Sequence, residues 1–212
     1  MNRKFGARTK SPAQPNPSSR EAILAAALKA FAQGGFEGAS LPKIARMANV
    51  APPLIHYYFN SKDNLWRETV DHSLGELRRE STAILNATKT LAPLDRLRVL
   101  LGATTHFAAR CPDHFSMIIA EARADSEHYA WVQENYTGVL FREVMAILAD
   151  AREKNQIKDV PLEHLASMLV GGILVRFSTD PGIGKEGDVE KLADEYTEML
   201  FAVLMDGLAV RP

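Results

Sequence analysis

Residues 41–65 read LPKIARMANVAPPLIHYYFNSKDNL, and this stretch decides the fold of the N-terminal part of the chain. Its first apolar residues, at positions 41, 44, 45 and 48, recur at helical spacing. Asn49 tolerates left-handed geometry and therefore suits the end of that helix. Pro52 and Pro53 fit a first helical turn, where backbone N–H groups have no intrahelical partner. The stretch predicts a short helix, a tight turn, a second helix from about residue 51, and a third helix capped at Asn60-Ser61.

The second predicted helix has two unlike faces. Ile55 and Phe59 are four residues apart and point inward. The opposite face carries rings and no acidic residue, so it can approach thymine methyl groups, base edges and phosphates without repulsion. Lys62 lies in the first turn of the third helix, where the helix dipole disfavours a cation. A lysine at that position suits a site that holds an anion such as a phosphate.

These residues resemble the N-terminal DNA-binding domain of the TetR family of transcriptional regulators. The motifs that carry the resemblance are SLPKIA at 40–45, NV at 49–50, IHYYF at 55–59 and SKDNL at 61–65. The resemblance is specific over about residues 20–67, and it implies a helix-turn-helix whose residues 51–59 form the recognition helix in the major groove. By position, it implies phosphate contacts from Ser40, His56 and Lys62, and contacts near bases from Pro52, Pro53, Leu54 and Tyr57. Lys43 completes the expected DNA-binding set.

Three positions depart from the family pattern. The family usually has Gly where this chain has Asn49, Ser or Thr where it has Ala51, and Tyr where it has His56. Losing the hydroxyl cap at position 51 weakens the helix start by roughly 1 kcal/mol. The recognition face has no Arg, Asn or Gln, so we expect apolar contacts to thymine methyls and some reading of DNA shape.

The charge of the chain is unevenly distributed although its net value is −1. Residues 1–62 contain nine Lys or Arg and two acidic residues, which leaves this part at +7 and the remainder at −8. A basic end beside a helix-turn-helix is typical of a protein that binds duplex DNA. Residues 1–18 cannot build a core and are expected to be disordered. They form either a basic arm that reaches phosphates or the minor groove, or a solvated tail.

The rest of the pattern predicts an all-α fold of about nine helices. After the helix-turn-helix domain at 19–66, residues 67–212 are expected to form a helical ligand-binding and dimerisation domain. Its first helix continues from residue 62 to about 88. Further helices are predicted at about 94–110, 113–122, 124–154, 161–178 and 187–208.

The last two predicted helices are unusually apolar, with stripes wide enough to bury one face in the core and another in a partner. They look like the four-helix dimer interface of the resembled family. A homodimer would also place two recognition helices on two half-sites. The expected interface residues are Leu169, Ile173, Phe177, Tyr196, Leu200 and Val203. An ordinary intrachain core is the alternative interpretation of the same stripes.

The middle helices combine aromatic, methionine and polar residues, as a small-molecule pocket requires. The resemblance implies an effector there, and the candidate ligand-binding residues are Phe107, Met117, Glu121, Trp131 and Tyr136. An effector of unknown identity would shift the long connecting helix and so change the spacing of the two recognition helices.

Other classes of function have less support. The chain has no glycine-rich phosphate loop, no nucleophile–base motif and no His pair at metal-binding spacing, so we expect no cofactor, no metal and no enzyme activity. Cys111 is the only cysteine, which fits a reducing cytoplasm. The apolar runs are shorter than the ~20 residues that span a bilayer, so no membrane partner is expected.

The sequence therefore predicts a ligand-responsive transcriptional regulator, usually a repressor, that binds a palindromic operator in double-stranded DNA as a dimer. Two alternatives stay open. One is a helical interaction module without sequence-specific DNA binding, because of the departures at positions 49, 51 and 56. The other is a helical enzyme that uses the His, Glu and Asp side chains of residues 106–128.

Overall fold

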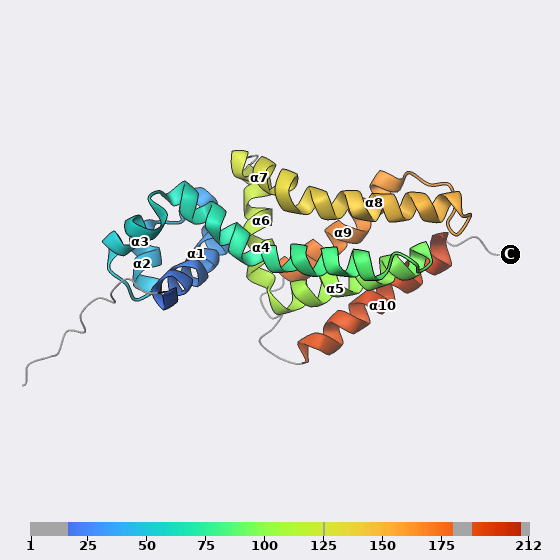
Figure 1. The fold of residues 1–212 in the computed structure, drawn as a ribbon, viewed down its shortest axis with the longest axis horizontal. Coiled ribbons are helices and arrows are strands. Elements are labelled where there is room, and N and C mark those ends of the chain that lie inside the picture. The colour runs from blue at the N-terminus through green and yellow to red at the C-terminus, as the bar shows by residue number, and fades with distance from the viewer. Residues whose placement is uncertain (1–16, 125, 180–187, 209–212) are drawn as a thin grey trace, which may run out of the picture.

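The computed structural model describes residues 17–124, 126–179 and 188–208. Figure 1 shows an elongated molecule in which the N-terminal helices form one end and the C-terminal helices the other, with α4 running between them. The predicted basic arm, residues 1–18, lies outside the described residues except for its last two positions.

The N-terminal part consists of α1 (Pro17–Gly38), α2 (Leu41–Met47) and α3 (Pro52–Phe59), followed by the long helix α4 (Lys62–Ala87). The C-terminal part contains α5 (Pro93–Arg110), α6 (Pro112–Ala124), α7 (Glu127–Val132), a π-helical turn η1 (Gln133–Thr137), α8 (Gly138–Glu153), α9 (Leu162–Ser178) and α10 (Val189–Leu208). The all-α fold, with an N-terminal helix-turn-helix and a C-terminal helical part, is confirmed. The segment predicted as one helix at 124–154 is divided into α7, η1 and α8.

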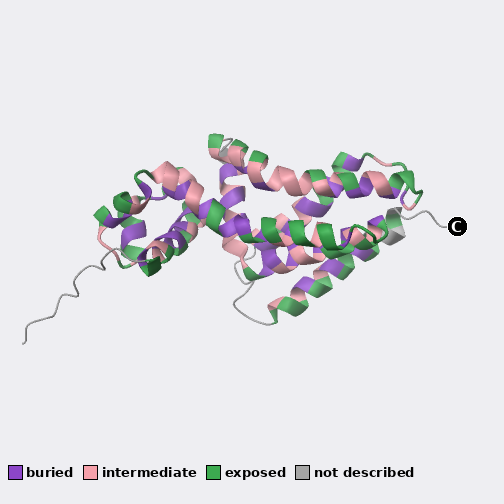
Figure 2. Cartoon of the chain, in the orientation of Figure 1, coloured by how far each residue is buried: buried purple, intermediate pink, exposed green. Residues whose placement is uncertain are grey.

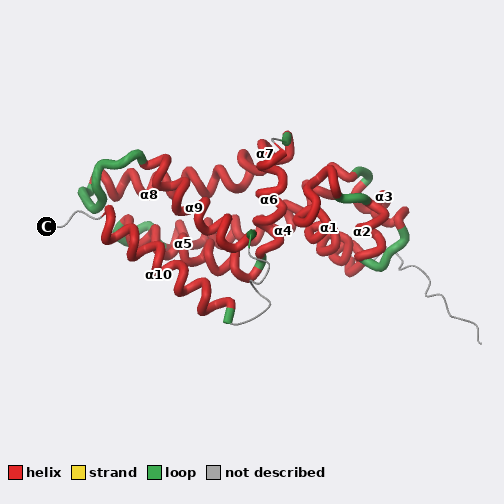
Figure 3. Tube along the Cα trace, turned by 180° about the vertical axis from the view of Figure 1, so that it is seen from behind, coloured by secondary structure: helices red, strands yellow, loops and turns green. Residues whose placement is uncertain are grey.

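Figure 3 shows helices joined by loops along the described part of the chain, which contains no β-strand. Among these helices, none combines the length and the apolar character that crossing a bilayer requires.

The helix-turn-helix has a compact apolar core. Ile23 and Phe31 of α1, Ile44 of α2, and Ile55 and Phe59 of α3 are each no more than 1% exposed. Each such side chain contributes roughly 1.5–3 kcal/mol by leaving water. Figure 2 shows this buried interior continuing from the N-terminal helices into α4. The short helices α2 and α3 are therefore held in place by burial rather than by their own length.

Helix α1 breaks at Gly35, close to its C-terminal end. Gly35 has φ 64°, in the left-handed region that glycine adopts without steric cost. The break turns Phe36 back toward the bundle, where its ring lies 4.0 Å from that of His128, centroid to centroid. Helix α1 packs against both α4 and α6, so the N-terminal part is attached to the bundle along two helices.

The π-helical turn η1 depends on a second glycine. The N–H of Gly138 donates to the carbonyl of Gln133, five residues earlier. A Cβ atom at position 138 would lie 2.3 Å from that carbonyl oxygen. The wide turn that joins α7 to α8 therefore requires glycine at this position.

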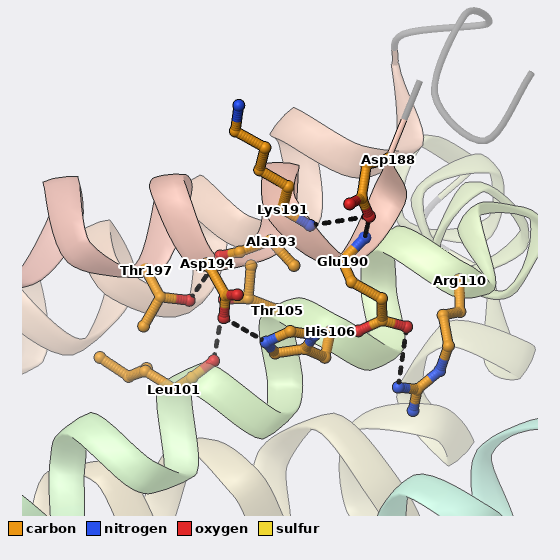
Figure 4. A network of polar contacts seen from close by, with 10 residues as sticks. All are labelled: Leu101, Thr105, His106, Arg110, Asp188, Glu190, Lys191, Ala193, Asp194 and Thr197. Atoms are coloured by element: carbon orange, nitrogen blue, oxygen red, sulfur yellow. Dashed lines mark hydrogen bonds and ion pairs between the residues drawn. The ribbon is translucent and has the colours of Figure 1, made fainter. Parts of the chain in front are cut away.

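Helix α10 is fastened to α5 by a group of polar contacts (Figure 4). His106 of α5 lies between two carboxylates of α10, with Nδ1 2.5 Å from Glu190 and Nε2 2.9 Å from Asp194. Arg110 approaches Glu190 at 3.6 Å. Asp188 caps the start of α10 by accepting from the N–H groups of residues 190 and 191. These contacts fix the direction in which α10 runs along the bundle.

Candidate nucleic-acid interface and cavity

The local geometry of α2 and α3 follows from their end residues. Ser40 caps α2, and its hydroxyl accepts from the N–H of Lys43 at 3.4 Å. Asn49 ends the turn with φ 55°, as its tolerance of left-handed geometry predicts. Ala51 precedes α3 and makes no side-chain cap, while Pro52 and Pro53 occupy the first turn. The prolines set φ for a helix that lacks the usual hydroxyl cap.

Most of the predicted DNA-binding residues lie on one open surface. Pro52, Pro53 and His56 of α3 are exposed, and Tyr57 is 68% exposed, which is unusual for an aromatic side chain. Ser40 and Lys43 are exposed at the start of α2. Arg46 and Met47, which the sequence analysis left out, are exposed on the same short helix. We call the exposed residues of α2 and α3, together with Ser40, the recognition surface.

Leu54 does not belong to the recognition surface. It is 8% exposed, so its burial does not favour the expectation that it lies near bases, which stays a prediction. Leu54 is buried because position 54 lies beside Ile55 on the wide inner face of α3. Only side chains on the outer face of so short a helix remain open.

Lys62 is half-buried and held by its own chain. Its Nζ lies 3.5 Å from the carbonyl oxygen of Glu37 and 4.4 Å from the centre of the Phe36 ring. A phosphate contact from this lysine stays a prediction, and it would require the ammonium to share its hydrogens with Glu37.

The junction between α1 and the bundle contains a buried carboxylate. Glu121 of α6 is 2% exposed. Its Oε1 accepts from the N–H of Phe36 at 2.5 Å, and its Oε2 accepts from the hydroxyl of Ser126 at 2.7 Å. His128 of α7 reaches Asp63, in the first turn of α4, at 2.9 Å. Glu121 of α6 and His128 of α7 therefore contact the chain just before α2 and just after α3.

A cavity of about 280 Å³ lies between α4, α5, α6, η1, α8 and α9, and it is partly open to solvent, since its lining includes the exposed Arg78, Thr82, Asn86 and Lys89. Of the five candidate ligand-binding residues, only Tyr136 lines it. Phe107 and Met117 are core residues, Glu121 belongs to the junction, and Trp131 packs edge-on against Trp66. Those four assignments are not supported, because residue type alone does not distinguish a core side chain from a lining one.

Tyr136 occupies a polar edge of the cavity. Its hydroxyl donates to Asp71 of α4, and the guanidinium of Arg78 lies 5.3 Å from its ring centre. Burial, together with the hydrogen bond to Asp71, raises the pKa of Tyr136 to about 12. The phenol therefore stays protonated and ties η1 to α4 at neutral pH.

Half of the predicted dimer-interface residues are buried within the single chain. Leu169, Ile173 and Phe177 of α9 are at most 4% exposed, so they belong to the intrachain core, and a partner contact from them stays a prediction that this burial does not favour. Tyr196 and Leu200 of α10 are half-buried, and Tyr196 packs edge-on against Phe177 at 5.5 Å. Only Val203 of the predicted set is well exposed. The strongly exposed apolar side chains of these two helices are Met168, Val175, Met199 and Val203.

His114 and Cys111 do not form a reactive pair. Burial, followed by the charge of His72, lowers the pKa of His114 to about 4. Burial also raises the pKa of the Cys111 thiol, which disfavours the nucleophilic thiolate. In the described part of the chain, no group of three or more His, Cys, Asp or Glu side chains could hold a metal ion.

The depressed pKa of His114 predicts a pH-dependent stability. The unfolded chain takes up a proton near pH 6.5, whereas the folded chain does so only near pH 4. Protons therefore favour unfolding between these values, and stability falls as the pH is lowered. Between pH 7.5 and 5 we expect His114 to cost about 2 kcal/mol of unfolding free energy, measured by urea denaturation. The His114→Leu variant should lose less over the same range, and an identical loss in both proteins would refute this origin.

These features define an all-α chain with an N-terminal helix-turn-helix and a C-terminal helical bundle. Residues 23–69 match the family described as bacterial regulatory proteins, tetR family. That match covers α1 from Ile23, α2, α3 and the first two turns of α4, so it assigns the helix-turn-helix part of the chain to the TetR family.

Relatives support the same assignment. The HTH-type transcriptional regulator BetI of Rhizobium meliloti is 36% identical over 85 residues, which cover 40% of this chain and 41% of that protein. BetI of Agrobacterium fabrum is 26% identical over 92% of this chain and 94% of its own length. A TetR-like transcriptional regulator from Rhodococcus sp. RHA1 shares the fold, with a TM-score of 0.69 and 21% identity, over 92% of this chain and all of that one.

Proposed function

We propose that this chain is a homodimeric, effector-controlled repressor that binds a palindromic operator through its recognition surface. The observation that carries the proposal is the outer face of α3, where Pro52, Pro53, His56 and the 68% exposed Tyr57 stand together without an acidic neighbour on α2 or α3. An exposed tyrosine with no function costs solubility and gains nothing, whereas at a groove it supplies stacking and methyl contacts.

Electrostatics supports this surface as a DNA contact. Lys43 and Arg46 of α2 are exposed beside α3 and form no ion pair within the part of the chain that the structure describes. Both cations are therefore free to neutralise phosphates on either side of a groove occupied by α3. His56 holds its Nδ1 3.3 Å from the carbonyl oxygen of Asn60, which leaves Nε2 for an outside partner.

The exposed apolar side chains of α9 and α10 support a dimer. Met168 and Val203 are 71% and 63% exposed, and Val175 and Met199 add to the same two helices. Such side chains gain free energy when a second copy covers them. In this proposal the buried face of α9 packs within its own chain. The contact with the second copy is made by Met168, Val175, Met199 and Val203.

The position of the cavity supports control by an effector. Its wall includes α4, and only residues 60 and 61 separate α4 from the end of α3. An effector that shifts α4 would move the recognition surface directly, and Glu121 would pass movement of α6 to the end of α1. We therefore propose residues 19–66 as the DNA-binding domain and 67–212 as the effector and dimer domain, with α4 continuous across the boundary. BetI of Rhizobium meliloti is itself described as a transcriptional regulator.

Selection of bound duplexes from a random DNA pool, at near-physiological salt, tests the proposal. We expect enrichment of one two-fold symmetric sequence. Binding of that duplex should weaken about tenfold or more in Tyr57→Ala, because each good base contact contributes roughly 1–3 kcal/mol. In Lys43→Gln, the slope of log affinity against log salt should fall by about 2, one phosphate per half-site.

Lys154→Gln is the matched control, because Lys154 pairs with Asp150 at the far end of α8 and should not affect DNA binding. Enrichment of an asymmetric site would refute the dimeric repressor. A folded protein that enriches no sequence would favour the helical interaction module instead.

A further inference from the structure

The cavity has an unbalanced set of charged lining residues. Arg78, Lys89 and Arg96 line it together with a single acid, Glu143. None of the three cations forms an ion pair among the residues that the structure describes. The walls around them are mainly apolar, with Leu74, Leu77, Leu85, Phe115, Val139, Leu140, Val170 and Leu174. Arg78 and Lys89 are exposed to solvent, whereas Arg96 is half-buried, so the cost of an unpaired charge falls mainly on Arg96.

Arg96 shows where a counter-charge is missing. Its Nε is shielded from solvent and has no hydrogen-bond partner. An arginine guanidinium stays protonated, so its charge remains even in such a site. A buried donor without an acceptor costs free energy, and the cost is larger when the donor is charged. Arg96 also differs from Arg98 on the same helix, which reaches the carboxylate of Glu198 at 2.7 Å.

The shape of the cavity restricts the molecule that fits it. Its lining on α4 extends from Leu74 to Asn86, which corresponds to ~18 Å along the helix at ~1.5 Å per residue. Within so long a lining, a volume of about 280 Å³ leaves a narrow space rather than a round one. Lys89 follows the end of α4 and Arg96 lies near the start of α5, one connection away, whereas Arg78 lies on α4 about one turn from Leu74, over the ring of Tyr136. Leu74, at the other end of the α4 lining, and Phe115 of α6 are apolar.

From this arrangement we infer that the effector is an elongated organic anion, with a carboxylate or similar head group at Arg96 and Lys89 and a narrow apolar body along α4 toward Leu74 and Phe115. This inference rests on the proposed function, in which the cavity holds the effector. Glu143 of α8 is the one lining group that repels an anion. Asn86 and Thr82 are polar groups on the α4 side of the path.

Isothermal titration of the full-length protein with decanoate, decanol and decylamine tests the charge, because the three probes share a ten-carbon chain. We expect decanoate to bind and decylamine not to. Affinity for decanoate should fall at least about tenfold in Arg96→Met, which removes the charge and keeps most of the aliphatic stem. Arg79→Gln is the control, because Arg79 is exposed on α4 and does not line the cavity.

Arg96→Met removes the buried Nε that has no hydrogen-bond partner, so the variant should melt at a temperature at least as high as the parent protein, which separates lost binding from lost folding. Equal affinity for decanol or decylamine would overturn the anionic class, and failure of decanoate to bind would overturn the elongated acid. Either failure alongside an enriched palindrome leaves the repressor standing. Decanoate binding without any enriched DNA would support the anion site and count against the repressor.

Discussion

Replacing Trp66 by alanine should lower the free energy of unfolding by about 4 kcal/mol, the largest loss that we expect from any single substitution in this chain. Trp66 of α4 is fully buried, and its ring lies edge-on to His128 at 4.4 Å and to Trp131 at 5.9 Å. Alanine would leave a large cavity where the helix-turn-helix part meets α7, and neighbours on rigid helices relax into such space only partly. Urea denaturation followed by circular dichroism measures the loss.

Trp66→Phe separates the ring from its N–H group. The indole Nε1 is buried and has no hydrogen-bond partner. Phenylalanine keeps an aromatic ring in place and removes that unsatisfied donor, so it should cost clearly less than alanine, about 1 kcal/mol. An equal loss in both variants would mean that the indole N–H contributes to the fold. A loss below 1 kcal/mol in Trp66→Ala would mean that the junction contributes little to stability.

Replacing Glu121 by alanine should cost about 3 kcal/mol and act most strongly on the end of α1. The substitution removes the acceptor for the N–H of Phe36 and for the hydroxyl of Ser126. It also removes the negative charge that lies 4.0 Å from His128. A buried donor that loses a charged acceptor carries the full cost of its desolvation. Hydrogen exchange at the Phe36 amide should accelerate roughly 100-fold, which corresponds to about 3 kcal/mol of local stability.

Glu121→Gln is the matched control for this experiment. A glutamine keeps one oxygen for Phe36 and offers an N–H₂ group to the hydroxyl of Ser126. It should lose less than half as much stability as alanine, and Phe36 should keep most of its protection. If both substitutions accelerate exchange at Phe36 equally, then geometry at this junction depends on the charge of Glu121 and not on its hydrogen bonds.

The helix-turn-helix was predictable because its signals are local. Asn49 at φ 55°, the prolines that begin α3 and the Ser61 cap of α4 each act within one turn of the helix that they end or begin. The start of α3 was placed within one residue. A short helix also has few alternative faces, although Leu54, predicted near bases, is buried on the inner face.

The bundle was less predictable because periodicity shows that a face is apolar but not what covers it. Ile173 and Phe177 fit a partner-facing stripe and a core-facing stripe equally well, and the structure places both in the core of their own chain. The cavity was harder still. Arg96 reads in the sequence as an ordinary surface arginine, and only the packing of six helical elements reveals that its Nε is enclosed.

The π-helical turn at Gln133–Thr137 has a consequence for how this protein could change over evolutionary time. A π turn holds one more residue than an α turn over the same rise. Deleting one codon there would restore an ordinary α turn, and α7 and α8 would keep their relative direction because the π turn alone holds the extra residue. The change would fall on η1 itself, whose Tyr136 and Thr137 line the cavity beside Leu140 and Glu143 of α8. One deletion would thus alter one edge of the cavity, while the lining residues of α8 kept both their identity and their direction.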